Sequence, residues 1–167
     1  QQLVYRTNDV VIFENADALP RAFIVHRAEV VDDKTALPRL RRDDFDPRAL
    51  LILAEGDALT GDGAQRADER AEISEYKATR VVIDARLSAP GYLALTDSWY
   101  PGWAARVDGI ETPIRRADYI FRAVRLDAGT HRVEFEYRPM SLIVGALISA
   151  AGLIALLGAM WLGRRTK

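Results

Sequence analysis

The feature that most constrains this chain is a run of 22 residues near its C-terminus, Ser141 to Leu162, without a charged side chain. As a helix rising about 1.5 Å per residue, this run covers roughly 33 Å, which matches a hydrocarbon core of roughly 30 Å. Uncharged runs of about 18 or more residues are typical of transmembrane helices, and a buried core helix is the alternative. The sequence therefore predicts one transmembrane α-helix over residues 140–163, with the lipid bilayer as its partner.

Residues around this helix predict its orientation and its neighbours. Trp161 lies where an indole favours the headgroup region, and the basic tail over residues 164–167 favours the cytoplasm. We therefore expect residues 1–139 to be extracytoplasmic, which needs a signal or span upstream and so a longer parent protein. A tail-anchored protein with a cytosolic domain is the alternative. Gly145 and Ser149 would let other transmembrane helices, of this chain or of a partner, approach closely, although an alanine-rich composition explains them equally well.

Residues 1–139 have the pattern of a β-rich domain. Val133, Phe135 and Tyr137 alternate with charged residues, as in a strand with one buried face. Strands without long amphipathic helices predict a mainly β fold, an antiparallel β-sandwich of the Ig-like or jelly-roll-like kind, followed by the C-terminal transmembrane helix. The predicted strands, separated by turn signals, cover residues 10–15, 22–31, 49–55, 71–76, 80–88, 91–98, 103–109, 119–126 and 131–139. A helical turn is expected at 46–49, and a mobile loop at the polar, Gly-rich residues 55–70.

Composition excludes several kinds of chemistry. The chain has no cysteine and only two histidines, His26 and His131, which lie far apart and outside any metal-ligand spacing. There is no nucleotide-binding loop and no nucleophile elbow. All 24 acidic residues precede Met140 and no basic stripe is present, so nucleic acid is not an expected partner. We expect no metal, no cofactor and no catalytic residue in this chain.

The sequence LTDSWYPGWAARVDG, residues 95–109, holds the candidate binding residues Asp97, Trp99, Tyr100 and Trp103. Aromatic faces stack on the apolar C–H surfaces of sugars, so the turn could be a glycan platform. The other interpretation is a core corner, with both tryptophans buried and Pro101-Gly102 supplying the bend. The pattern favours this second interpretation, with Tyr100 as the exposed ring and Asp97 bonded to turn amides. Two of the three carboxylates Asp97, Asp108 and Asp118 could also form a pair for glycoside hydrolysis, but turn roles explain Asp97 and Asp108 better.

An ordered series of short motifs resembles the C-terminal part of the YfhO-type bacterial membrane proteins, over nearly the whole chain. The matching motifs are Leu19-Pro20-Arg21-Ala22, Trp99-Tyr100-Pro101-Gly102-Trp103, Val107-Asp108-Gly109, Ala117-Asp118-Tyr119, Phe121-Arg122-Ala123-Val124, Gly129-Thr130-His131 and Tyr137-Arg138-Pro139, followed by the hydrophobic helix.

The resemblance implies a multi-span protein similar to the glycosyltransferases that use polyprenyl-phosphate sugars and glycosylate polymers of the bacterial cell envelope. It implies an extracytoplasmic C-terminal domain in the cell (inner) membrane, and places the catalytic acids in an N-terminal half that this chain lacks. The expected function is thus that of a non-catalytic accessory domain and membrane anchor, which contacts an envelope glycan or a polyprenyl-phosphate sugar through Tyr100, Trp99, Trp103 and Asp97. A purely structural domain that braces the membrane part is the alternative.

Overall fold

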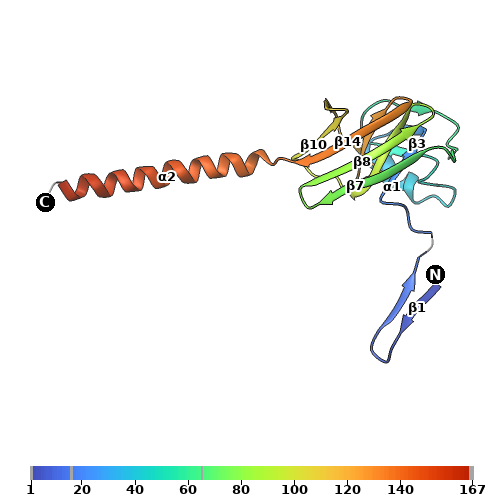
Figure 1. Ribbon diagram of the computed structural model, residues 1–167, viewed down its shortest axis with the longest axis horizontal. Helices are drawn as coiled ribbons and strands as arrows, with labels where there is room; N and C mark the ends of the chain where they lie inside the picture. Colours follow the sequence, from blue (N-terminus) through green and yellow to red (C-terminus); the bar gives the residue numbers. More distant parts are fainter. Residues whose placement is uncertain (1, 16, 65, 166–167) are drawn as a thin grey trace.

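The computed structural model describes residues 2–15, 17–64 and 66–165, and the fold is given for these residues. Figure 1 shows a β-sandwich from which a long helix projects on one side and a short β-hairpin on the other. The helices are α1 (Asp33–Leu40) and α2 (Met140–Arg165). The strands are β1 (Gln2–Arg6), β2 (Val11–Glu14), β3 (Ala22–Val25), β4 (Arg27–Val30), β5 (Leu51–Leu53), β6 (Leu59–Thr60), β7 (Arg70–Lys77), β8 (Arg80–Leu87), β9 (Gly91–Ser98), β10 (Trp103–Val107), β11 (Ile110–Thr112), β12 (Arg115–Ala117), β13 (Phe121–Leu126) and β14 (Gly129–Tyr137).

Two sheets form the sandwich in the described part of the chain. One has the order β11-β10-β14-β8-β7 and the other the order β3-β9-β13-β12-β5-β4-β6. The core between them is built from alternate residues, such as Val133 and Phe135 of β14 against Leu93 and Leu95 of β9. This confirms the mainly β sandwich and the C-terminal helix that the sequence predicts.

The larger sheet curls and encloses a second core. The sequence predicts a single strand over residues 22–31, but His26 divides it into β3 and β4. These strands lie near opposite ends of the sheet order, although one residue separates them, so the two ends of the sheet must approach each other. In β9, Tyr92 and Ala94 consequently face the second core, while Leu93 and Leu95 face the first. Every residue of β5 is buried for the same reason.

One strand pair departs from the predicted antiparallel pattern. β4 and β5 run parallel, and parallel neighbours need a crossover connection, which residues 31–50 supply with α1. Asp32 caps this helix by accepting a hydrogen bond from the Thr35 amide at 2.9 Å. The sequence pattern does not predict α1, because eight residues interrupted by Pro38 carry little helical periodicity. The expected turn at 46–49 is confirmed, with the Asp46 carboxylate accepting from the Arg48 amide.

The polar segment 55–70 is more structured than a plain loop. It contains the short strand β6, which pairs with β4, whereas the sequence pattern predicts no strand in this segment. Near the end of the segment, the Glu69 side chain is only 6% exposed and lies 2.7 Å from the Nε2 atom of His26. Both contacts tie the segment to the curled sheet.

The helix α2 and the hairpin β1–β2 lie outside the sandwich (Figure 1). The first 18 residues of α2, Met140–Leu157, are apolar and long enough to cross a membrane, and none of the side chains described in that window is buried. This exposure does not fit the alternative of a buried core helix. In the basic tail expected at 164–167, Thr166, Lys167 and the side chains of Arg164 and Arg165 lie outside the described residues.

Candidate functional site

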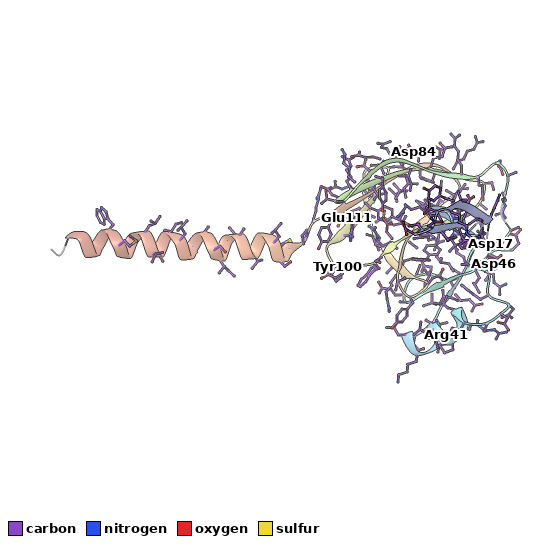
Figure 2. All side chains as sticks on the ribbon, turned by 90° about the horizontal axis from the view of Figure 1, so that it is seen from below. Asp17, Arg41, Asp46, Asp84, Tyr100 and Glu111 are labelled. Atoms are coloured by element: carbon purple, nitrogen blue, oxygen red, sulfur yellow. The ribbon has the colours of Figure 1, made fainter. Side chains whose placement is uncertain are left out.

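The β-topology gathers several loops at the end of the sandwich from which α2 leaves, called here the helix-proximal end. β9 ends beside the start of β13, because Ser98 pairs with Phe121. β10 begins beside the last residue of β14, because Trp103 pairs with Tyr137. The turns 78–79, 99–102 and 118–120 therefore lie at the same end as Pro139, which precedes α2. Figure 2 shows Tyr100 on the side of the domain that faces this helix.

An open cleft of about 440 Å³ lies at the helix-proximal end. Four aromatic residues line it, Tyr76 of β7, Tyr100 of the 99–102 turn, Trp103 of β10 and Tyr137 of β14. Three charged residues, Lys77, Asp97 and Arg122, also line it. The cleft thus combines aromatic faces with hydrogen-bonding groups, which is the general composition of a small-molecule site.

Asp97 is the centre of the polar wall of the cleft. Its Oδ2 atom accepts from Nη2 of Arg122 at 2.9 Å, and its Oδ1 atom accepts from Nη1 of Arg21 at 2.9 Å. The hydroxyl of Tyr76 donates to Oδ1 at 3.1 Å. The expectation that Asp97 bonds turn amides is wrong, because its side chain, near the end of β9, meets groups from residue 21, β7 and β13 instead.

Arg122 is a further candidate site residue that the sequence interpretation did not single out. Its side chain is 2% exposed and its guanidinium carbon lies 3.9 Å from the centre of the Trp103 ring. Burial lowers the pKa of Arg122, and the nearby Asp97 charge opposes that shift. The Nε and Nη1 atoms have no hydrogen-bond partner among the described residues, and the stacked ring covers the guanidinium plane. A signal existed in the strand alternation, since Arg122 shares its strand face with Val124 and Leu126.

In the aromatic turn, one tryptophan packs on the core and the other lies on the surface, so neither interpretation describes the whole turn. Trp103 is half-buried and packs on the core, with its ring 5.4 Å from that of Tyr137, as the core interpretation expects. Tyr100 is 63% exposed, as expected. Trp99 is 40% exposed, so its predicted place in the core is wrong. Its amide donates to the carbonyl of Ile120, and this contact holds it on the surface beside the cleft rather than among the cleft's lining residues.

Gly102 joins the aromatic turn to the chain entering α2. Its φ of 103° favours glycine, and a Cβ there would stand 3.2 Å from the Cα of Pro139. The Arg138 amide donates to the Gly102 carbonyl at 2.6 Å. The turn is therefore fixed directly against the segment that leads into the helix.

The three aspartates considered for acid–base catalysis are not brought together. Asp108 lies in the β10–β11 turn, where it accepts from the Arg132 amide and contacts His131. Asp118 is buried with its Oδ1 accepting from the Ile52 amide at 2.9 Å, and burial raises its pKa to about 7 against the lowering effect of that hydrogen bond. Each aspartate has its own local role, and no group of metal-binding side chains is found among the described residues.

Comparison with known proteins identifies the family. The model of the family described as "Bacterial membrane protein YfhO" matches residues 53–149, which is more than half of the chain. The chain belongs to the YfhO family. The matched range includes β7–β14, every residue that lines the cleft and the first ten residues of α2. In this bacterial membrane protein family, the apolar helix α2 fits a lipid bilayer.

A curated relative gives the scale of a YfhO protein. The "Uncharacterized protein YfhO" of Bacillus subtilis (strain 168) is 29% identical over 103 residues, which are 62% of this chain and 12% of the relative. The chain thus spans about an eighth of the length of that relative. No solved structure gives a significant match.

Proposed function

We propose that this YfhO chain is the extracytoplasmic accessory domain and C-terminal anchor of a larger membrane protein that transfers sugars to cell-envelope polymers. In this proposal the chain is not catalytic, and its basic tail lies in the cytoplasm. The cleft at the helix-proximal end contacts the acceptor glycan or the polyprenyl-phosphate sugar. The observation that carries the proposal is the composition of this cleft.

The chemistry of the cleft suits a sugar ring. Tyr100 offers an exposed face for the C–H surface of a pyranose, and Trp103 and Tyr137 form an apolar wall behind it. Asp97 is already oriented by Arg21, Arg122 and the Tyr76 hydroxyl, and its remaining lone pairs can accept hydrogen bonds from ring hydroxyls. A preformed polar network reduces the ordering cost of binding.

Binding can be measured by the fluorescence of the full chain in nanodiscs. In a Trp161→Phe background, the emission comes from Trp99 and Trp103, and Trp103 lines the cleft. We expect methyl glycosides or envelope glycan fragments to change this emission in a saturable way. Tyr100→Ala should weaken binding about two- to tenfold, since one aromatic stacking contact is worth about 0.5–1.5 kcal/mol.

Ile110→Ala provides the matched control, because Ile110 is 73% exposed and is not part of the cleft lining. It should bind as the parent chain does. Equal affinity of the Tyr100→Ala variant and the parent would contradict the assignment of the cleft.

A structural brace is the second candidate function. It is favoured by the half-buried Trp103 and by the contact of Gly102 with Pro139, which couple the sandwich to the segment entering α2. A chain that binds none of the glycans, and whose emission responds only to unfolding, would support this second function.

A further inference from the structure

The membrane boundary can be placed relative to the sandwich. The uncharged run begins at Ser141, and Pro139 lies two residues earlier, at most about 7 Å along the chain. The headgroup layer on each side of the hydrocarbon core is roughly 5–7 Å thick. Pro139, and the turn at Gly102 that packs against it, therefore lie within or at the edge of this layer. The conclusion depends on the covalent connection and this one contact, and not on the direction of α2.

The surface at this level is apolar and aromatic. Trp99, Tyr119 and Ile120 are 40%, 38% and 52% exposed, and we call them the helix-proximal patch. They come from two loops that lie side by side, because the Trp99 amide donates to the Ile120 carbonyl at 2.6 Å. In the 118–120 turn, Asp118 and Tyr119 have positive φ angles of 44° and 72°, a backbone conformation that is costly for residues other than glycine. The side chains of Tyr119 and Ile120 are exposed in this conformation.

The chemistry of the patch matches the bilayer interface better than bulk water. Tryptophan and tyrosine are enriched at the headgroup level, where one part of the ring meets apolar groups and another stays hydrated. A basic side chain flanks the patch. The guanidinium of Arg116, which pairs with Asp33, lies over the Tyr119 ring at 5.4 Å, where it can also meet a lipid phosphate.

We propose that the helix-proximal end of the sandwich rests in the lipid headgroup layer, with Trp99, Tyr119 and Ile120 as its contact with the bilayer. The patch continues the membrane contact that α2 begins. This docking holds the open cleft at the membrane surface. The inference requires only that α2 spans the bilayer and does not depend on the binding of any sugar.

Spin labelling in phospholipid vesicles tests this docking directly. The chain has no cysteine, so single variants Ile120→Cys and Ala128→Cys can be labelled without removing other residues. Ala128 lies in the exposed β13–β14 turn, and β14 separates that turn from Tyr137 by about 27 Å at 3.3 Å per residue. The full chain should be reconstituted in vesicles of phosphatidylcholine and phosphatidylglycerol.

The proposal expects the label at residue 120 to be more accessible to oxygen and less accessible to a water-soluble nickel complex than the label at residue 128. Equal, fully aqueous accessibility at both sites would overturn it. A second measurement leaves the patch side chains intact. In the variant with Trp103→Phe and Trp161→Phe, brominated lipids should reduce Trp99 emission, and emission unchanged by bromination would likewise overturn the proposal. Circular dichroism confirms that each variant is folded.

Discussion

At the scale of single residues, the buried ion pair of Arg122 and Asp97 organises the cleft. Arg122 is 2% exposed and Asp97 15%, so the buried Arg122 charge depends on Asp97 for compensation, while Asp97 also pairs with Arg21. Removing one partner of a buried pair leaves an uncompensated charge, whereas replacing the pair by apolar groups is often tolerated. The stack of Arg122 between Trp103 and Phe135 shows that an apolar side chain would find suitable neighbours there.

Replacing Asp97 by alanine should therefore destabilise the domain by about 3–5 kcal/mol. The double variant with Asp97→Ala and Arg122→Met should recover most of that loss, because no buried charge then remains. Urea unfolding of the full chain in mild detergent, followed by tryptophan fluorescence, measures both variants. A double variant as unstable as the single one would show that the pair contributes net stability, rather than satisfying a charge that is already buried.

At the scale of elements, turn chemistry determines how the strands connect. The β10–β11 hairpin turns through Asp108 and Gly109, with φ angles of 52° and 83°. Two successive positive φ values are typical of a type I′ turn, for which Asp-Gly is a preferred sequence. The Asp108 carboxylate also accepts from the Arg132 amide at 2.8 Å, which fixes the hairpin to β14.

Gly109→Ala measures what the positive φ at this position costs a residue that has a Cβ. An added Cβ meets nothing within 4 Å, so no steric clash accompanies the substitution. The positive φ alone should cost about 1–2 kcal/mol. Gly109→Asn should cost less, because asparagine tolerates the left-handed region. Thermal unfolding by circular dichroism compares the two variants, and an alanine variant as stable as the parent would contradict the assigned turn.

At the scale of the whole molecule, the two ends of the sandwich differ. The helix-proximal end carries the cleft and the patch, and the distal end carries two histidines, each placed between a carboxylate and a carbonyl. His26 lies 2.9 Å from the Pro90 carbonyl and 2.7 Å from Glu69. Burial raises the pKa of Glu69, but hydrogen bonds from Ser88 and His26 lower it by a larger amount. The pKa of Glu69 therefore lies below its ordinary value of 4.5. Ionised Glu69 thus ties segment 55–70 to the curled sheet.

The lowered pKa predicts loss of stability in acid. Glu69 binds its proton more weakly in the folded chain than in the unfolded one, so its contribution is present above about pH 4.5 and is lost as the pH falls through the folded pKa. Glu69→Gln should be less stable than the parent at pH 7, and the difference should shrink below pH 4. Urea unfolding at both pH values measures this. The control Glu72→Gln, at an exposed position of β7, should lose as much stability in acid as the parent does. If Glu69→Gln also lost as much stability in acid as the parent, the prediction would be contradicted.

Much of the architecture could be predicted from local patterns. The alternation in residues 131–137 predicts β14 because a strand with one buried face repeats every two residues. The uncharged run predicts α2, because a bilayer core accepts only helices or closed barrels without charges on the lipid side. Residues 22–31 could not be divided correctly, since the break at His26 follows from the curl of a sheet in which β3 pairs with β9 and β4 with β5, partners distant in the sequence.

The sequence by itself determined the β-rich domain, the apolar helix and the aromatic turn, because hydrophobic periodicity and turn residues act over a few neighbouring positions. The tertiary structure alone decided that Asp97 meets Arg21, Tyr76 and Arg122, and that Trp99 stays on the surface beside Ile120. These contacts join strands distant in the sequence, and their partners follow from strand order and register, which no local pattern encodes.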